Sequence, residues 1–337
     1  MRMFARIDPM VRLLVLAIAI AAVLPATGPA REAAQAVSNA AIFLLFLLNG
    51  LRLPRTEVRR GIGNWRMLVP LTLWCFGAMA LIGKGFEIGL SGWMPPTAAL
   101  GFLYLGVLPS TVQSATAYSS LAGGNVANSV VAAALLNVAG VFISAPLFAA
   151  LGGGEAVSPG AGGLLKVVLI LIVPFAIGQF LQARLSGWVG DHRNLVTWMD
   201  RASIAIAVYV AMSGAVEQGL WSRVGLLAWV ILLGGVVGFL FAAFAGSWFL
   251  SGQFGLDRSA RIAFLFAGAH KSIAMGAPLA AVLFPPAVAG MVLLPLLAYH
   301  LLQLVASAPI ASRLARHPRP FPDGGDCNGP TTTATGR

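Results

Sequence analysis

The stretch "FLFAGAHKSIAMGAPLA", residues 264–280, places polar and helix-breaking residues inside an otherwise apolar segment. Its polar triplet "HKS" occupies positions 270–272, and Gly276 and Pro278 follow. A charged side chain at the centre of a bilayer costs roughly 2.5–3.5 kcal/mol on insertion scales, so a lysine there predicts a function. We expect the two helix-breakers to unwind a membrane span and the triplet to present its polar groups to the resulting cavity. The alternative, a lysine near a span end that snorkels to water, is disfavoured by the apolar residues on both sides.

The composition is that of a membrane protein. Of the 337 residues, 58% are hydrophobic and 10% are charged, with a mean hydropathy of +0.85, whereas soluble domains carry about 25% charged residues. Apolar runs of about 20 residues, the length that a helix needs to cross a bilayer, recur along the chain. The net charge of +11 does not indicate nucleic-acid binding, because the basic residues lie between these runs, where they set topology and contact lipid headgroups. The predicted fold class is an all-α polytopic membrane protein.

We expect ten transmembrane spans in one domain, residues 1–315. Their ranges are 11–27, 34–51, 67–85, 98–121, 126–151, 163–185, 200–218, 224–250, 261–284 and 287–312. Of the 22 Lys and Arg residues, 17 lie in the terminal segments and loops on one side and four on the other, which predicts that both termini are cytoplasmic. The first span also has features of a signal peptide, but we favour a retained helix because its removal would leave an odd number of spans. Residues 316–337, rich in Pro, Gly, Thr and charge, are predicted to be a disordered cytoplasmic tail.

A second polar segment, "GVLPSTVQSATAYSSLAGGN" at 106–125, also combines helix-breakers with hydroxyl and amide side chains. With five spans per half, the two segments fall in the fourth span of each half. Paired interruptions of this kind point to a transporter binding site. Because five is odd, the second half must cross the membrane upside down relative to the first, as an inverted repeat. For any single Ser or Thr the alternative is a hydrogen bond within its own helix or to a neighbouring one.

Three segments, "LPSTVQSATAYSSLAGGNVANSVV", "FAGAHKSIAMGAPLAAVLF" and "LPLLAYHLLQL", resemble the bile acid:sodium symporter superfamily over roughly residues 10–312. The closest branch is grouped with solute carrier family ten, member seven, and carries His-Lys-Ser in its ninth helix. The resemblance implies a core of spans 3–5 and 8–10, a panel of spans 1, 2, 6 and 7, and discontinuous helices 4 and 9 that cross at mid-membrane. It also implies uptake of amphipathic organic anions coupled to sodium.

Only some of the family's sodium ligands have a counterpart in this sequence. The family's Gly-Asn and the serine that follows it match residues 124–125 and Ser129. Thr116 stands where sodium-coupled members have an asparagine, and the adjoining serine corresponds to Ser114 or to the next residue. Those members also have an acidic ligand, but residues 264–269 contain no acid. A sodium ion near Ser114, Thr116, Asn125 and Ser129 is therefore one hypothesis among others.

Lys271 has no acidic partner nearby in the sequence, because all eleven Asp and Glu residues lie in loops, tails or span ends. Its ammonium group could occupy a sodium site permanently, bonded to carbonyls of the unwound helix. It could instead lose and regain a proton during transport, or pair with an anionic substrate. The first two roles predict coupling that depends on pH more than on sodium. His270 could relay protons or tie the ninth helix to a neighbour, and His300 most simply bonds Gln303, which lies on the same face.

The leading hypothesis is a secondary active transporter of a small organic anion, coupled to sodium or protons and working by alternating access. The alternative is a regulatory membrane protein that affects ion homeostasis without moving an organic substrate. No enzyme is predicted, because the sequence has no HExxH or CxxC motif and no paired carboxylates in a span, and no cofactor is expected apart from sodium. Size and the lack of further targeting signals indicate a bacterial inner membrane, and no pattern specifies an oligomeric state. The candidate binding residues are Ser110, Thr111, Gln113, Ser114, Thr116, Asn125, Asn128, Ser129, His270, Lys271, Ser272 and His300.

Overall fold

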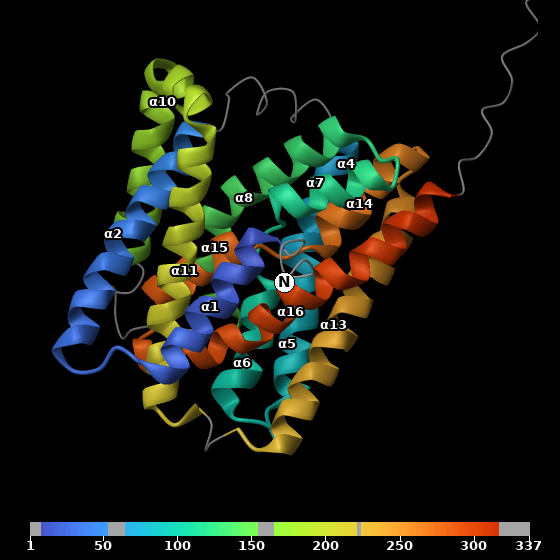
Figure 1. Ribbon diagram of the computed structural model, residues 1–337. Coiled ribbons are helices and arrows are strands. Elements are labelled where there is room, and N and C mark those ends of the chain that lie inside the picture. The colour runs from blue at the N-terminus through green and yellow to red at the C-terminus, as the bar shows by residue number, and fades with distance from the viewer. Residues whose placement is uncertain (1–7, 53–64, 154–164, 221–223, 317–337) are drawn as a thin grey trace, which may run out of the picture.

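The computed structural model describes residues 8–52, 65–153, 165–220 and 224–316, and within these ranges it contains helices and no β-strand (Figure 1). The α-helices are α1 (Pro9–Val23), α2 (Pro29–Arg52), α4 (Trp65–Thr72), α5 (Met79–Leu90), α6 (Pro96–Gly106), α7 (Val112–Leu121), α8 (Val126–Phe148), α10 (Val173–Asp191), α11 (Arg193–Glu217), α13 (Leu226–Gln253), α14 (Arg258–Ala269), α15 (Ile273–Leu283) and α16 (Pro286–Ala315). There are also three π-helical turns: η2 (Leu73–Ala78) joins α4 to α5, η3 (Ala149–Gly153) follows α8, and η5 (Val168–Ile172) precedes α10. The predicted tail lies outside the described residues, apart from Arg316.

Eight helical segments of the described chain are long and apolar enough to cross a membrane. Two of the predicted spans are not among them. The first corresponds to α1, which ends at Val23 after 15 residues, and the fourth is divided into α6 and α7. The all-α polytopic class is thus confirmed with eight candidate spans and two shorter apolar helices, α1 and α6.

The two polar segments are both broken, as the sequence predicts. Helix α6 ends at Gly106 and α7 begins at Val112, while α14 ends at Ala269 and α15 begins at Ile273. Between them the chain is extended, for example at Thr111 (φ −88°, ψ 138°) and His270 (φ −81°, ψ 141°). The breaks contact each other, because the Ser272 amide donates to the Pro109 carbonyl oxygen at 2.9 Å.

The predicted cause of the second break is wrong. Gly276 and Pro278 lie inside α15, and the break precedes them. Gly276 instead permits close packing, since a Cβ there would lie 2.5 Å from the Leu296 side chain and 2.6 Å from that of Leu108. Pro278 has no amide hydrogen to donate to the carbonyl one turn earlier, that of Ala274.

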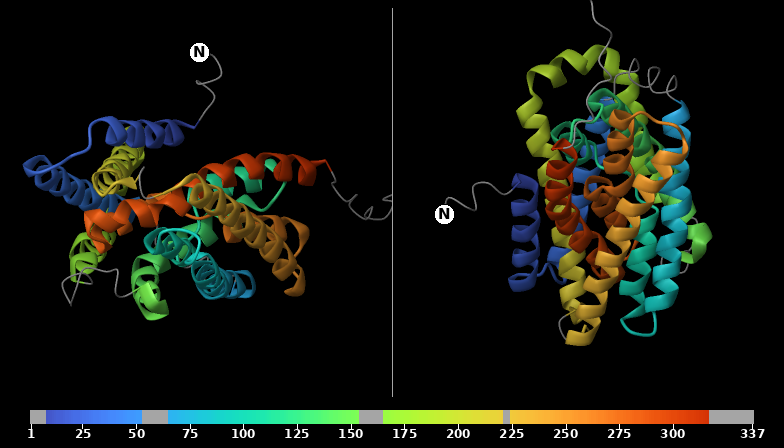
Figure 2. Two further views of the ribbon diagram at one scale, coloured as in Figure 1. Left: turned by 90° about the horizontal axis from the view of Figure 1, so that it is seen from below. Right: turned by 90° about the vertical axis from the view of Figure 1, so that its right-hand side faces the viewer.

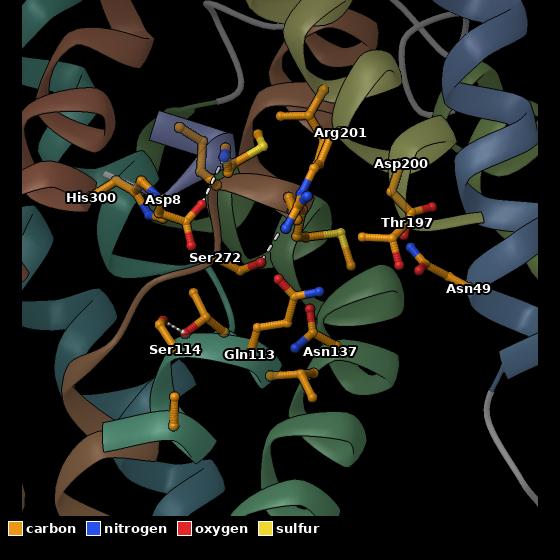
Figure 3. A pocket seen from close by; sticks show the side chains of 18 of the residues that line it. Asp8, Asn49, Gln113, Ser114, Asn137, Thr197, Asp200, Arg201, Ser272 and His300 are labelled. Atoms are coloured by element: carbon orange, nitrogen blue, oxygen red, sulfur yellow. Dashed lines mark hydrogen bonds between the residues drawn. The ribbon is translucent and has the colours of Figure 1, made fainter. Parts of the chain in front are cut away.

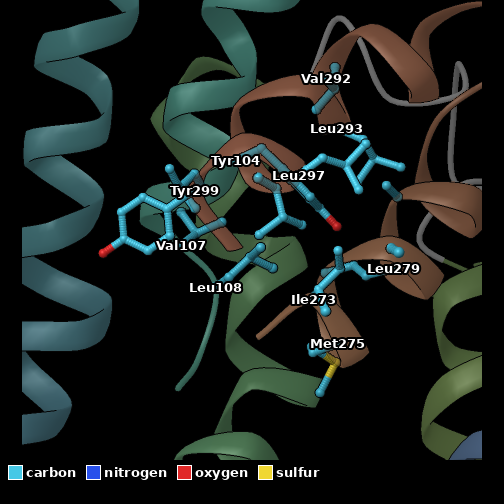
Figure 4. Packing of buried hydrophobic residues seen from close by; sticks show 14 of the residues in the cluster. Tyr104, Val107, Leu108, Ile273, Met275, Leu279, Val292, Leu293, Leu297 and Tyr299 are labelled. Atoms are coloured by element: carbon cyan, nitrogen blue, oxygen red, sulfur yellow. The ribbon is translucent and has the colours of Figure 1, made fainter. Parts of the chain in front are cut away.

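Side chains from distant helices satisfy the carbonyl groups that the breaks release. Ser144 donates to Val107 at 2.8 Å and Asn137 donates to Ser110 at 2.6 Å. At the second break, Tyr299 donates to Ala269 at 2.5 Å and Trp74 to Gly268 at 3.2 Å. Apolar residues enclose the crossing, among them Leu108, Ile273 and Leu297 (Figure 4). Unpaired backbone groups are too costly in hydrocarbon, so these donors make the breaks possible.

Two groups of helices lie on either side of the crossing (Figures 1 and 2). Helices α1, α2, α10 and α11 pack together on one side, and α5, α6, α13 and α14 lie on the other, with α16 in contact with both groups. Helices α2 and α10 approach closely through Gly50 and Gly178, where a Cβ on either residue would overlap the backbone of the other helix. Small residues allow this kind of backbone contact between membrane helices.

Candidate functional site

A cavity of about 970 Å³ lies beside the crossing, between the group α1, α2, α10 and α11 and the helices α7, α8, α15 and α16. Its walls are formed by α2, α7, α8, α11, α15 and α16, together with the start of α1 and Phe175 of α10. Much of the lining is apolar, including Phe46, Val141, Ile204 and Met275. A cavity of this size accommodates an organic molecule, since small-molecule sites commonly occupy about 300–1,000 Å³.

The polar residues of the cavity fall into three groups (Figure 3). Gln113, Ser114 and Asn137 lie together, Asp8 and His300 lie on a second side, and Ser272 stands between them near the centre. The third group, from α2 and α11, consists of Asn49, Thr197, Asp200 and Arg201. The cavity is therefore amphipathic, with several hydrogen-bonding groups directed at an apolar chamber.

The charged residues of the cavity are not equivalent. Asp200 forms an ion pair with Arg52, and the Asp8 carboxylate caps α1 by accepting from the Met10 amide at 2.7 Å. Arg201 stacks its guanidinium over the Trp198 ring at 5.5 Å. Among the described residues Arg201 forms no ion pair, and the neighbouring Asp200 acts on it only through a longer-range electrostatic interaction.

His270 is fully buried and does not line the cavity. Its Nδ1 atom lies 2.9 Å from the Ser114 hydroxyl, and its Nε2 atom lies 2.8 Å from the Ser307 hydroxyl. Ser114 also shares a 2.5 Å hydrogen bond with Thr111. The ring therefore ties the second break to α7 and to α16, as the tethering alternative for His270 expects.

Lys271 is also fully buried and turned away from the cavity. Its Nζ atom donates to three backbone carbonyls, those of Leu108 at 2.8 Å, Gly106 at 2.9 Å and Cys75 at 3.2 Å. The expectation that the whole triplet faces the cavity is thus wrong, since only Ser272 does so. The carbonyls at the end of α6 attract the ammonium group more strongly than the cavity does, because a helix C-terminus carries partial negative charge.

Two of the four predicted sodium ligands are engaged in hydrogen bonds in this structure. The Ser114 hydroxyl is already bonded to His270, and the Asn125 side chain accepts from the Asn128 amide at 2.9 Å, capping α8. The hydroxyls of Thr116 and Ser129 are buried without a hydrogen-bond partner. Within the described ranges no cluster of three or more His, Cys, Asp and Glu residues occurs. The sodium ion near Ser114, Thr116, Asn125 and Ser129 therefore stays a prediction.

The remaining predicted residues are divided between the cavity and its surroundings. Thr111, Gln113, Ser114, Ser272 and His300 line it. Ser110 is buried beside it with an unpartnered hydroxyl, and residues 125–129 lie outside its lining. The predicted bond between His300 and Gln303 is confirmed, at 3.0 Å.

Sequence reasoning missed the contribution of α2, α8 and α11 to the cavity. Asn49 and Asn137 are single amides within apolar runs, and a scan of each predicted span for isolated polar residues would have found both. Thr197, Asp200 and Arg201 lie near the expected loop before the seventh span. There the sequence offers no sign that they point inward.

Comparisons with known proteins identify the family of this chain. The model of the SBF-like CPA transporter family matches residues 8–316. "Putative symporter YfeH" of Escherichia coli is 34% identical over 326 residues, which cover 94% of this chain and 95% of that protein. "Uncharacterized protein PA2026" of Pseudomonas aeruginosa is 36% identical over 307 residues, covering 90% and 91%. Rat "Sodium/bile acid cotransporter 7" is 20% identical over 289 residues, 80% of each chain. The resemblance read from the broken spans is confirmed, and the chain belongs to the SBF-like CPA transporter family of the bile acid:sodium symporter superfamily.

Proposed function

We propose that this transporter moves a small organic anion across the membrane by alternating access. The observation that carries the proposal is the cavity of about 970 Å³ beside two crossing broken helices. Its apolar walls suit the body of an amphipathic molecule, and Arg201, which forms no ion pair among the described residues, suits an anionic group. Arginine presents several donors in a fixed plane, which matches carboxylate and sulfonate oxygens.

The proposal includes a ten-span arrangement of two inverted five-span repeats. Helix α1 and the pair α6–α7 complete the ten with the eight long candidates. The corresponding breaks at 107–111 and 270–272 support this symmetry. The group α1, α2, α10 and α11 would then be the panel, which moves against a core that contains the crossing.

The orientation belongs to the same proposal. With both termini in the cytoplasm of a bacterial inner membrane, the basic loop after Arg52 and the start of α11 face inward. Arg52, Asp200 and Arg201 lie at the cavity next to those segments. The structure is then an inward-facing state whose cavity opens to the cytoplasm.

The driving ion is a cation, either sodium or a proton. The hydroxyls of Thr116 and Ser129 offer sodium two free ligands. No catalytic step is part of the proposal, since transport needs only binding and conformational exchange.

The test is a thermal-shift screen of organic anions on the purified chain, followed by uptake into proteoliposomes under sodium or proton gradients. We expect amphipathic monoanions to raise the melting temperature and to be taken up. Arg201→Gln should weaken binding roughly 10- to 100-fold, because a hydrogen bond to a charged group contributes about 1.5–3 kcal/mol. Arg193→Gln is the matched control, because Arg193 is exposed at the start of the same helix and does not line this cavity. If no anion binds and neither gradient drives uptake, the transporter assignment of this cavity fails and the regulatory alternative gains support.

A further inference from the structure

The ammonium group of Lys271 lies in a site that resembles a cation site made of backbone oxygen atoms. Gly106 is the last residue of α6, and Leu108 follows in the break. The last carbonyls of a helix have no partner within it, and at this end of α6 they carry the negative pole of the helix dipole. Cys75, the third partner, lies in the π-helical turn η2, a geometry that often occurs at functional sites.

The number of donors matches the number of acceptors. A lysine ammonium has three N–H donors and no acceptor, and the three carbonyls accept one hydrogen bond each at 2.8, 2.9 and 3.2 Å. A neutral amine would have only two hydrogens and would leave one carbonyl unpaired. None of the ion pairs among the described residues includes Lys271. All three described hydrogen bonds of the ammonium group therefore go to backbone carbonyls.

The main chain of Lys271 is held as firmly as its side chain. Its amide donates to the Gln303 side-chain oxygen at 2.8 Å, and its carbonyl accepts from the Gln303 amide nitrogen at 3.2 Å. The next residue, Ser272, donates its own amide to Pro109. The lysine thus links α16, η2 and both broken helices at one point.

We propose that the Lys271 ammonium is a built-in cation, which fills the place that a free metal ion would occupy at the broken helices. In transporters with discontinuous membrane helices, the carbonyls of the unwound segments and the C-termini of the half-helices coordinate the coupling cation. Here those oxygen atoms are already occupied by a group that is covalently attached to the chain. The tethered ammonium group cannot be released on the far side of the membrane, as a coupling ion must be. It also occupies the oxygen atoms that sodium would need, so sodium is not required at the crossing. This consequence for coupling rests on the proposed transport function, whereas the binding geometry does not.

The first test is thermal unfolding of the purified full-length chain in detergent, in sodium, potassium or N-methylglucamine chloride at equal ionic strength. We expect the wild-type melting temperature to be the same in all three salts, because the carbonyl site is filled. A saturable rise specific to sodium that remains in a Thr116→Val, Ser129→Ala double variant would overturn the proposal.

The second test replaces the tethered cation with a free one. Lys271→Ala removes three carbons and the ammonium group, which together correspond to n-propylammonium. We expect this variant to melt several degrees lower than the wild type and to recover part of the loss in a saturable way when n-propylammonium is added. Neutral n-propanol should have no such effect. If propylammonium does not stabilise the folded variant, the built-in cation is wrong.

Two variants serve as controls. Lys271→Met fills the space without a charge and should not respond to propylammonium. Lys84→Ala removes a lysine that pairs with Glu87 at 2.9 Å near the end of α5, and it should not respond either. If Lys271→Ala does not fold, the melting temperatures of the wild-type chain in the three salts still test the proposal. None of these measurements requires transport, so a failure of the transport proposal would leave their outcome unchanged.

Discussion

At the scale of single residues, Gln303 explains how the second break is tolerated. It is fully buried on α16, and its side-chain amide bonds both the amide and the carbonyl of Lys271. It therefore replaces the backbone partners that an intact helix would have supplied. Its Nε2 atom also approaches His300 at 3.0 Å, which connects the break to a residue that lines the cavity.

Replacing Gln303 should destabilise the protein strongly. Gln303→Leu leaves the amide and carbonyl of Lys271 unpaired, and each unsatisfied buried group costs roughly 1–3 kcal/mol. We expect a lower free energy of unfolding in denaturant titrations of the purified chain. Gln253→Leu, at the exposed end of α13, should change it little. Equal stabilities of the two variants would show that Lys271 finds other partners.

At the scale of helices, the position of the Lys271 site depends on the contact between α5 and α6. A Cβ on Gly83 would lie 2.6 Å from the Phe102 carbonyl oxygen, and one on Gly106 would lie 2.6 Å from that of Met79. The two backbones therefore touch, which places the end of α6 against the helix that continues from η2. The carbonyls of Gly106 and Cys75 reach the same ammonium group because of this contact.

Two glycines on α5 provide a matched comparison. Gly83→Ala should push α6 away, lower the melting temperature and weaken the carbonyl site. Gly85→Ala should be neutral or slightly stabilising, because nothing lies within 4 Å of its Cβ position and alanine favours the helical state. Melting curves of both variants, measured side by side, test this. A larger loss for Gly85→Ala would contradict the packing described for α5 and α6.

At the scale of the whole molecule, the end of the helix bundle opposite the charged residues of the cavity is closed by a seam of small residues. A Cβ on Gly214 of α11 would overlap the Pro286 carbonyl, and one on Gly290 of α16 would overlap that of Ala211. Gln35 of α2 donates to the Ala281 carbonyl at 3.4 Å nearby. Helices α11 and α2 thus meet α16 and α15 directly at this end, and alternating access would require the seam to open.

A bulky residue in the seam should favour the open form. Gly290→Val forces α11 and α16 apart, so a cysteine placed at the buried position Ala281 should react with a membrane-impermeant thiol reagent from outside. Without Gly290→Val, the same cysteine should react slowly. Gly234→Val is the control, because the Cβ position of Gly234 has no neighbour within 4 Å. Equal labelling in all three backgrounds would show that this seam does not separate the cavity from the outside.

The sequence predicts the two helix breaks but not which groups bond to the backbone atoms that the breaks release. Clustered hydroxyls in 110–120 and the triplet at 270–272 mark the two interruptions, because polar side chains are rare in spans without a reason. The sequence does not reveal the role of Gly276. A glycine that unwinds a helix cannot be distinguished, from sequence alone, from a glycine that allows a neighbouring side chain to pack closely. The partners of Lys271 are backbone atoms more than 160 residues away in the chain, and every residue type has a carbonyl. Arg201 stands at the start of an expected span, and only the packing of α11 shows that it lines the cavity.

The hydrogen bonds at the first break also bear on how the protein is synthesised. The carbonyls of Gly106, Leu108 and Pro109 accept from Lys271 and Ser272, which the ribosome delivers only after most of the chain has entered the bilayer. Until then these oxygen atoms have no described partner in the first half, and hydrocarbon offers none. Segment 106–112 must therefore stay near water or the insertion machinery while translation continues. The final closure of the crossing is a late, post-insertion event, and truncation before residue 270 leaves the first half unfinished.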